Sequence, residues 1–587
     1  MAQIEDYGLI GDGRSAALVS RSGSIDWLCW PRFDSPAVFA ALLGDEADGR
    51  WRIFPAANPS GAFARRYLDE SLVLETRLEA EGGAARLIDF MPPASKVPCL
   101  VRLIEAEEGR IALSSRLRLA FDHGRRAPLL SLHRNGAAAV CGPSGCFLSG
   151  GPAARIERRE FVADFTLEAG QTASFVLCWF DPAGPPPHPP DPQAALAAGL
   201  ELWRAFSALC AYDGPWREAV VRSALTLWAL THRSSGAVLA APTSSLPERA
   251  GGTRNYDYRF CWLRDASFAI EALLEAGWKK EAQAWRGWLK RAASGDPASL
   301  QPVYRLSGEA NLPEWQAEWL IGWERSRPVR FGNAAALQKQ LDVYGETLLA
   351  MYAAEAAGEP ASSAERRLRR GLVEWIAANW RRPDKGIWEV RGPAQRFTHS
   401  MVLAWAGLDA AIRAAEAAKR LEPALARWRE VRAEIHAEAC QVCFDPVQQA
   451  FVQAAGSPRL DAAVLRLPLV GFLPADDPRL VSTVEAIRRR LSRGGLVRRY
   501  QPTPAGEGFA HAEGCFLPCS FWLVEVFALR GRRAQAEALF ERLLGLANDL
   551  GLFAEEYDPA ARRLLGNFPQ ALTHIGVIRA ALGLARA

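Results

Sequence analysis

The chain has 587 residues, too many for a single hydrophobic core, so we expect two or more domains. Apolar residues make up 49% and charged residues 23% of the sequence, values typical of a soluble globular protein. The formal net charge is only +4, from 70 basic and 66 acidic residues. This near balance argues against nucleic acid or an anionic membrane as a partner.

Neither targeting nor redox chemistry is indicated by the sequence. Residues 1–7 contain neither a basic segment nor an apolar one, and no stretch reaches about 18 uninterrupted apolar residues. We therefore expect a cytoplasmic protein without a membrane span. The 11 Cys are odd in number and irregularly spaced, and pairs such as Cys141 and Cys146 lack complementary ligands at zinc-like spacing. The sequence predicts free thiols, no metal and no cofactor.

Residues 1–180 have the pattern of β structure. Segments 85–90, 100–105 and 111–121 are short and partly alternate apolar with polar residues, and Gly-rich or charged turns separate them. Several such segments in a row predict an antiparallel β-sandwich as the N-terminal domain.

A connector is predicted over residues 181–215. Its first part, residues 181–192, is so rich in Pro that it cannot sustain a helix or a central strand. A helical segment over about residues 193–209 follows it.

From residue 216 to 587 the apolar period changes to three and four residues, which indicates roughly twelve helices. This number suits a closed double ring, an (α/α)6 barrel, as the second domain. A superhelical repeat array is the alternative, but no self-similarity of fixed period is present. The predicted helices begin near Glu218, Arg264, Lys279, Ala334, Ser362, His399, Glu422, Pro458, Pro478, Leu517, Arg533 and Pro569.

Three segments of this region combine carboxylates with aromatic residues: 255–265, 386–389 and 553–558. Aromatic rings stack on the apolar faces of a pyranose, and two carboxyl groups can supply the acid and the base for glycosidic hydrolysis. In a helical barrel the loops at one end converge, so these segments can meet around one pocket. The pattern predicts a sugar-cleaving site.

The two acidic segments predict different roles for their glutamates. Glu389 follows Trp388, and an indole beside a carboxyl group raises its pKa, as a general acid requires. Glu555 is followed by Glu556 and Tyr557, so we expect polar surroundings in which it stays ionised and activates water.

Basic residues near these segments predict contacts with sugar hydroxyls. Arg264 and Asp265 open a helix, where an Asp also suits the helix dipole, and together they can clamp vicinal hydroxyls. Arg499 and Tyr500 are expected to reach the leaving sugar.

The ordered motifs resemble glycoside hydrolase family 15, which holds glucoamylases, glucodextranases and some bacterial and archaeal α,α-trehalases. The resemblance covers nearly the whole chain. The matching motifs are residues 23–29, 31–35, 241–248, 258–265, 328–333, 342–346 and 566–570.

The resemblance implies a β-sandwich followed by an (α/α)6 barrel, and an exo-acting hydrolase that inverts the anomeric carbon. By motif, it implies that Glu389 is the general acid and Glu555 the general base. It places Arg264 and Asp265 at the distal hydroxyls of the terminal glucose and Arg499 at the leaving-group sugar. The resemblance also implies that the inner pocket is walled by Tyr256, Trp262 and Trp388. It implies an outer pocket formed by Trp319, Trp323, Arg327 and Arg330.

Departures from the family pattern fall where the leaving group is expected to bind. Trp319 and Trp323 stand where relatives often have His and Tyr, Met401 where Lys is common, and Val390 where fungal glucoamylases have a second acid. These differences affect the prediction of the substrate more than the prediction of the reaction.

The sequence thus predicts an enzyme that releases β-glucose from a small α-glucoside, with malto- or isomalto-oligosaccharides as the main interpretation and α,α-trehalose as the alternative. A non-catalytic sugar-binding protein and a phosphorylase are two further alternatives. The expected partner is a small carbohydrate, and a homo-oligomer is left open.

Overall fold

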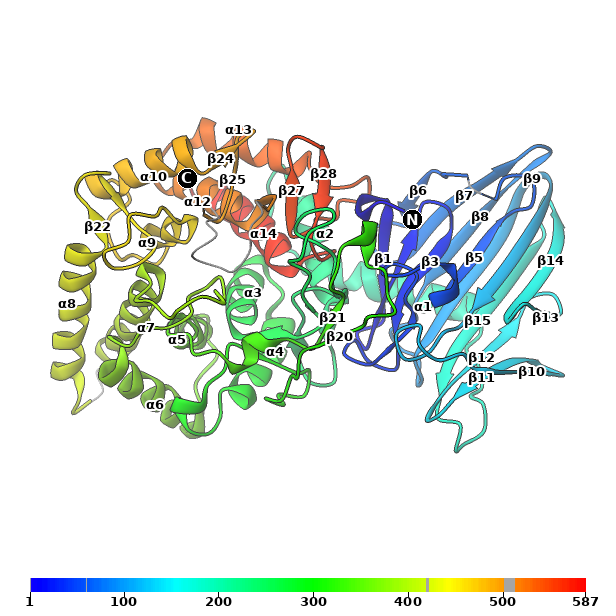
Figure 1. Ribbon diagram of the computed structural model, residues 1–587, viewed down its shortest axis with the longest axis horizontal. Helices are drawn as coiled ribbons and strands as arrows, with labels where there is room; N and C mark the ends of the chain where they lie inside the picture. The colour runs from blue at the N-terminus through cyan, green and yellow to red at the C-terminus, as the bar shows by residue number, and fades with distance from the viewer. Residues whose placement is uncertain (1, 60, 419–421, 501–512) are drawn as a thin grey trace.

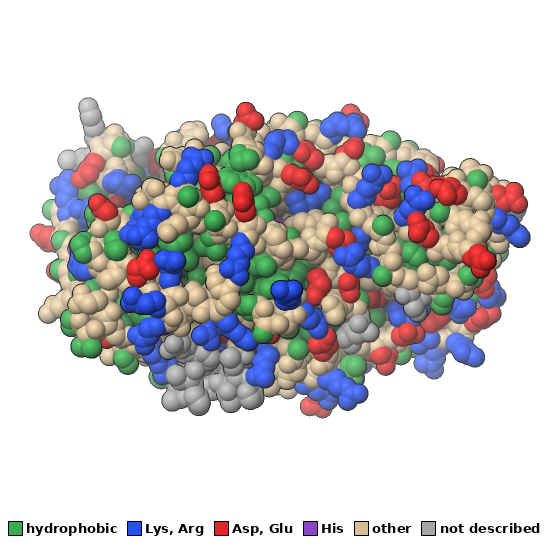
Figure 2. All heavy atoms as spheres, turned by 90° about the horizontal axis from the view of Figure 1, so that it is seen from above, with side chains coloured by type: hydrophobic (Ala, Val, Ile, Leu, Met, Phe, Trp, Pro, Cys, Tyr) green, Lys and Arg blue, Asp and Glu red, His purple; other side chains and the backbone are tan. Residues whose placement is uncertain are grey.

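A computed structural model describes residues 2–59, 61–418, 422–500 and 513–587. Figure 1 shows two parts side by side, with the strands of the N-terminal third at one end of the long axis and the helices at the other. On the face seen in Figure 2, acidic and basic side chains are interspersed, in line with the near-neutral net charge. Among the described residues, every helix is too short or too polar to cross a bilayer.

Antiparallel strands β1–β15 form the N-terminal part, called here the β domain. Their bounds are β1 (Tyr7–Gly11), β2 (Ala16–Ser20), β3 (Ser24–Cys29), β4 (Ala37–Phe39), β5 (Arg50–Pro55), β6 (Arg65–Tyr67), β7 (Leu74–Ala80), β8 (Gly83–Phe90), β9 (Cys99–Arg118), β10 (Leu129–His133), β11 (Gly136–Cys141), β12 (Ser144–Gly150), β13 (Arg155–Glu157), β14 (Glu160–Glu168) and β15 (Thr172–Phe180).

The long strand β9 joins the two layers of this domain. Its first half pairs with β8 and β15, and its second half pairs with β5 and β14. A strand that passes from one sheet to the other in this way closes the corner of a sandwich. Apolar residues of both layers, such as Trp51 and Leu103, are fully buried between them.

The connector contains a well-capped helix, α1 (Pro192–Ser207). Asp191 accepts a hydrogen bond from the Ala194 amide at 2.8 Å, and Pro192 takes the first helical position, where its missing N–H costs nothing. Trp203 of α1 packs edge-on against Trp228 of the barrel, with ring centroids 4.5 Å apart. The helix predicted in this region is therefore present; the domain limits at 180 and 216 stay predictions.

The helices that follow form two concentric rings. Neighbouring inner helices pack on one another around the ring: α3 with α5, α5 with α7, α12 with α14, and α14 with α3, while a short segment formed by η6 and α9 fills the place between α7 and α12. The inner elements are α3 (Leu263–Ala276), α5 (Asp342–Ala356), α7 (Thr398–Ala417), η6 (Ala462–Leu465) with α9 (Arg466–Leu469), α12 (Leu517–Leu529) and α14 (Ala571–Arg586).

Most outer helices pack against the inner ring, whereas α10 packs mainly against short strands in the neighbouring loops. The outer helices are α2 (Arg217–Ala229), α4 (Lys279–Ala292), α6 (Ser363–Asn379), α8 (Leu425–Val442), α10 (Pro478–Arg490) and α13 (Arg533–Leu544). Inner helices such as α12 are buried almost all round, whereas outer helices such as α4 bury one apolar face and expose a charged one. The predicted β-sandwich followed by an (α/α)6 barrel is confirmed.

Two predicted helix starts are wrong. The segment at Ala334 is a single 3-10 turn, η5 (Ala334–Leu337), capped by Asn333, and the inner helix begins only at Asp342. The segment near Pro458 is irregular until η6 begins at Ala462. In the first segment Ala335 and Ala336 are buried but Leu337 is exposed, so its apolar residues do not form one buried helical face.

Short elements in the loops complete the fold. They are η1 (Ile4–Asp6), η2 (Glu46–Asp48), η3 (Pro297–Ser299), η4 (Trp323–Arg325), β16 (Thr231–His232), β17 (Ala237–Val238), β18 (Cys261–Trp262), β19 (Val303–Tyr304), β20 (Trp315–Gln316), β21 (Arg330–Phe331), β22 (Phe444–Asp445), β23 (Ala450–Phe451), β24 (Ser492–Arg493), β25 (Leu496–Val497), β26 (Cys515–Phe516), β27 (Glu556–Asp558) and β28 (Arg563–Leu565).

Candidate active site

A cavity of about 270 Å³ lies among the loops that lead into inner helices α3, α7, α12 and α14. These loops are far apart in the sequence, and the closed ring brings them to one end of the barrel. Seven of the residues predicted from the sequence line the cavity together: Tyr256, Trp262, Arg264, Trp388, Glu389, Arg499 and Glu555.

Glu389 lies in a tight turn and points to the cavity. Its backbone has a φ of 57°, an unfavourable region for a residue with a side chain, and its amide donates to the Gly386 carbonyl at 3.0 Å. Trp262 Nε1 donates to Glu389 Oε1 at 2.5 Å, and Arg264 Nη1 lies 3.6 Å from the same oxygen. Burial raises the pKa of Glu389 although Arg264 opposes this, so the predicted direction is confirmed.

Glu555 is more deeply buried than its sequence neighbours suggested. Its side chain is 1% exposed, and Tyr258 donates its hydroxyl to Glu555 Oε1 at 2.5 Å. Burial, together with the negative charge of Glu248, raises the pKa of Glu555 to about 8. Its surroundings are polar, as expected, but burial and the charge of Glu248 disfavour the ionised form, so the expectation that this carboxylate stays ionised is wrong.

The side chain of Glu555 fills the space beside Gly566, where any other residue would have a Cβ atom. A Cβ atom at Gly566 would lie 2.6 Å from Glu555 Oε2, and the φ of Gly566 is +76°, which favours glycine. The turn before α14 thus requires glycine because the carboxylate packs directly against its backbone.

One short segment holds both carboxylates. Tyr258 binds Glu555 and Trp262 binds Glu389, and the centroids of these two rings are 5.5 Å apart. The two acids therefore line one cavity and are each held by a residue of the same short segment, although 166 positions separate them in the chain.

Arg264 and Asp265 do not play equivalent parts. Arg264 lines the cavity, donates from Nη1 to the Ile387 carbonyl at 3.0 Å and from Nε to Asp265 Oδ1 at 2.7 Å. The Asp265 side chain is fully buried and does not line the cavity. Asp265 thus orients Arg264 from behind, which corrects the expectation that both residues face the hydroxyls.

Arg499 lies at the centre of a buried acidic group. Its Nη2 lies 2.7 Å from Glu248, 2.8 Å from Glu513 and 3.2 Å from Glu556, while Arg254 also pairs with Glu248 and Glu513. These three carboxylates are close enough to hold a metal ion. The guanidinium group of Arg499 already occupies the position between them, so the group is a poor fit for a metal.

Aromatic side chains form much of the remaining wall. Trp388 donates from Nε1 to Asp461 Oδ1 at 2.8 Å, which fixes its indole beside the cavity. The Tyr256 ring has two guanidinium groups near it, that of Arg391 at 4.9 Å from the centroid and that of Arg330 at 5.2 Å. Both rings offer the flat apolar surfaces on which pyranoses stack.

The residues predicted for an outer pocket lie elsewhere. Trp323 is fully buried and donates to the Ala2 carbonyl, and Trp319 donates to the His123 carbonyl of the β domain. Arg327 is exposed, and Arg330 lies behind Tyr256 rather than at the cavity surface. The expected roles of these four residues are corrected, because contacts with the N-terminal part determine where the two tryptophans lie.

Sequence reasoning missed several residues of the cavity. Tyr258 and Glu248 lie inside motifs that were recognised, but no role followed from their positions alone. Gln338 donates from Nε2 to the Glu389 carbonyl at 3.0 Å, and nothing in its sequence context indicates this. The further cavity residues that were missed are Arg254, Lys385, Arg391 and Gln570, whereas Tyr500 was expected there.

Comparison with known proteins identifies the family. The model for glycosyl hydrolases family 15 matches residues 214–582, and that for a trehalase-like N-terminal region matches residues 1–120. The chain belongs to glycosyl hydrolases family 15. The predicted resemblance is thereby confirmed, and this family 15 protein is a glycosidase that acts on a carbohydrate.

Similar proteins of the family extend over the whole chain. The trehalase of Mycolicibacterium smegmatis is 36% identical over 621 residues, covering 100% of this chain and 91% of that protein. The trehalase of Thermoplasma volcanium is 32% identical over 590 residues, covering 99% and 93%. The crystal structure of a bacterial glucoamylase complexed with acarbose has a TM-score of 0.71 and 13% identity, covering 100% of this chain and 94% of that one, which shows a common fold.

Proposed function

We propose that this family 15 enzyme hydrolyses α,α-trehalose with inversion. The observation that carries the proposal is one small cavity, lined on its walls by both Glu389 and Glu555. Its volume of about 270 Å³ is just below the range for small-molecule sites, about 300–1,000 Å³, and suits a disaccharide better than a long glucan. Relatives named trehalase favour this substrate over the malto- and isomalto-oligosaccharides of our main interpretation.

In the proposed reaction Glu389 gives its proton to the glycosidic oxygen, and the bond between that oxygen and the anomeric carbon breaks. Glu555, in its ionised form, takes a proton from a water molecule, whose oxygen attacks the same carbon from the opposite face. One β-glucose and one α-glucose result. An inverting pair requires carboxyl groups roughly 6.5–9.5 Å apart, so that this water fits between them and the sugar.

Neighbouring groups support these two roles. The Trp262 indole N–H and the Arg264 guanidinium stabilise the anion that Glu389 becomes after proton transfer. The Tyr258 hydroxyl orients the carboxylate of Glu555 toward one water position. Arg264, fixed by Asp265, is placed to bind hydroxyls of the sugar that is cleaved.

Initial rates on trehalose, maltose and isomaltose, each with and without inorganic phosphate, test the substrate. We expect trehalose to be cleaved with the highest kcat/KM and without a need for phosphate. Faster turnover of maltose or isomaltose would restore the oligosaccharide interpretation, and a phosphate requirement with a sugar phosphate as product would identify a phosphorylase. Binding of trehalose without cleavage would leave only a sugar-binding protein. A cytoplasmic location stays a prediction.

A further inference from the structure

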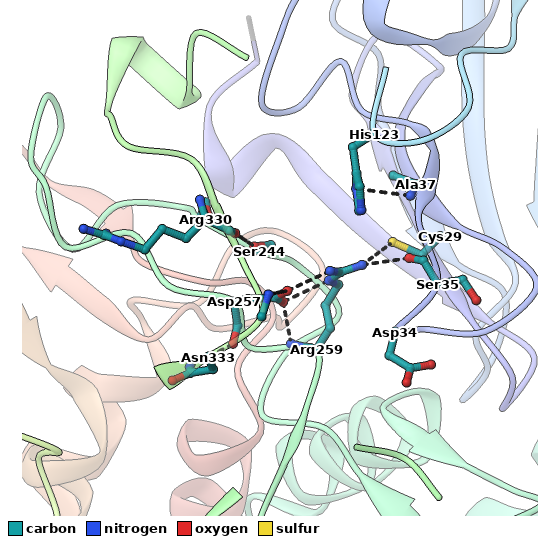
Figure 3. Close-up of polar contacts among 12 residues, drawn as sticks. Cys29, Asp34, Ser35, Ala37, His123, Ser244, Asp257, Arg259, Arg330 and Asn333 are labelled. Carbon is teal, nitrogen blue, oxygen red and sulfur yellow. Dashed lines mark hydrogen bonds and ion pairs between the residues drawn. The ribbon is translucent and has the colours of Figure 1, made fainter. Parts of the chain in front are cut away.

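A buried ion pair lies where the β domain meets the cavity wall. Figure 3 shows Arg259 extended between Asp257 on one side and Cys29 and Ser35 of the β domain on the other. Both side chains are nearly inaccessible, with Arg259 2% and Asp257 0% exposed. We propose that Arg259 is a positioning residue that, anchored on the β domain, holds the two segments that orient Glu389 and Glu555.

The anchor is made by main-chain and ring contacts. Arg259 Nη1 donates to the Ser35 carbonyl at 2.8 Å and to Cys29 Sγ at 3.4 Å. The guanidinium group also lies 5.2 Å from the centroid of Phe331, and that ring stacks on His123 of the β domain with centroids 3.7 Å apart. The position of Arg259 is therefore set by residues outside the barrel.

The first path from this anchor leads to Glu555. Arg259 pairs with both oxygens of Asp257, from Nε at 2.9 Å and from Nη2 at 2.7 Å, and its amide also donates to Asp257 Oδ1 at 3.1 Å. Tyr258 is the residue between them, so this clamp fixes the backbone on both sides of the tyrosine. Its hydroxyl is the group that donates to Glu555.

The second path leads to Glu389. The Gly332 amide donates to Asp257 Oδ2 at 3.1 Å, and Asn333 Nδ2 donates to the Asp257 carbonyl at 3.2 Å. Asn333 caps η5 by accepting a hydrogen bond from the Ala335 amide, and η5 leads directly to Gln338. Gln338 donates to the Glu389 carbonyl, inside the turn that presents the carboxylate.

A second arginine at the same boundary provides a matched control. Arg305 of the barrel pairs with Asp34 of the β domain at 3.2 Å, and its side chain is 35% exposed. Arg305 does not line the cavity and is not joined to either path. Replacing either arginine by lysine perturbs contacts across the boundary, but only Arg259→Lys removes the bidentate clamp.

The test compares wild type, Arg259→Lys and Arg305→Lys, with rates divided by the folded fraction from near-UV circular dichroism. The inference rests on the proposed roles of Glu389 and Glu555. The rates are measured on the α-glucoside that the wild type cleaves best, so the outcome does not depend on trehalose being the substrate. We expect Arg259→Lys to lower kcat by about 10- to 100-fold with little change in KM, since small misplacements of catalytic groups cost this much. Arg305→Lys keeps the wild-type kcat.

The pH profile separates positioning from a loss of stability. The Tyr258 hydrogen bond lowers the pKa of Glu555, so its weakening in Arg259→Lys moves the limb that reports ionisation of Glu555 to higher pH. If Arg259→Lys does not fold, Asp257→Asn replaces it in the test, because it keeps the side-chain shape but loses the bidentate pair. We expect Asp257→Asn to lower kcat and to move the same limb to higher pH. A variant with lower thermal stability but unchanged kcat and pH profile would overturn the proposal. If Glu555→Gln retains full activity, the assigned site fails instead.

Discussion

Arg102 in the β domain and Arg499 in the barrel are both buried guanidinium groups, but their surroundings differ. Arg102 pairs with both oxygens of Asp89 and donates to the Trp51 and Gly23 carbonyls, so charge and hydrogen-bonding capacity are matched. Arg499 faces three carboxylates with one other arginine near them, and Glu556 Oε2 has no hydrogen-bond partner among the described residues.

The difference indicates what each region is for. A buried pair whose groups are all satisfied specifies structure, whereas unmatched buried carboxylates cost stability and persist where they perform chemistry. At the cavity, Glu389 also adopts a positive φ, which is unfavourable for a residue with a side chain. Four predictions test this contrast. Three concern residues of the cavity, and one concerns the buried pair in the β domain.

The largest effect is expected at the two proposed catalytic acids. Glu389→Gln and Glu555→Gln each keep the side-chain shape but remove proton transfer, so each is expected to lower kcat by about 10²- to 10⁴-fold. Steady-state kinetics on trehalose measure it. Glu556→Gln, at a buried glutamate that does not line the cavity, should lose much less activity. A wild-type rate in either Glu389→Gln or Glu555→Gln would remove that residue from the mechanism.

In the β domain the opposite result is expected. Arg102→Met leaves Asp89 buried without its partner and should lower the free energy of unfolding by about 3–5 kcal/mol, while the folded fraction keeps its kcat. Urea denaturation and activity per folded molecule measure the two quantities. The double variant Arg102→Met with Asp89→Leu is expected to regain part of the loss. A selective fall in kcat would show that this pair is not purely structural.

Glu555→Gln is also expected to stabilise the fold in a pH-dependent way. The folded-state pKa of Glu555 is raised to about 8 from its usual 4.5, so the folded state favours the protonated carboxyl. Its contribution is therefore fully present below about pH 4.5 and is lost as the pH rises toward 8. Thermal melts should show a gain in Glu555→Gln that grows from pH 5 to pH 8, by at most about 1.4 kcal/mol per pH unit. Glu416→Gln, at an exposed glutamate, should show no such trend.

The smallest effect concerns the charge next to Glu555. Glu248→Gln removes the negative charge that, after burial, raises the pKa of Glu555, so ionisation becomes easier. The limb of the kcat/KM profile that reports Glu555 should move to lower pH by about one unit. A profile that stays in place, or moves upward, would show that Glu248 does not act on Glu555.

Much of the fold could be predicted from the sequence because it follows local rules. The Pro-rich segment, the change of apolar period at residue 216 and starts such as Pro478 and Arg533 agree with the structure. The start at Ala334 failed because this apolar run forms only a single 3-10 turn, in which Leu337 is exposed. Local sequence patterns predict regular helices and strands, whereas the conformation of a loop depends on its tertiary contacts.

The candidate site could be predicted only in part, for a related reason. Glu389, Glu555 and Arg264 lie in short motifs whose charged and aromatic residues already indicate a sugar-cleaving site. The positions of Trp319 and Trp323 depend instead on partners about 200 to 320 residues away, His123 and Ala2, which no local pattern reveals. The deep burial of Glu555 likewise results from the closed ring and not from its neighbours in the chain.

The anomeric form of the first glucose released tests the central claim most directly. Proton NMR recorded during the first turnovers of trehalose, before mutarotation, distinguishes the two anomers. Attack of water across the cavity predicts equal amounts of β-glucose and α-glucose, because only the cleaved anomeric carbon inverts. Release of α-glucose alone would contradict the account, since it would require a covalent intermediate and a different arrangement of Glu389 and Glu555.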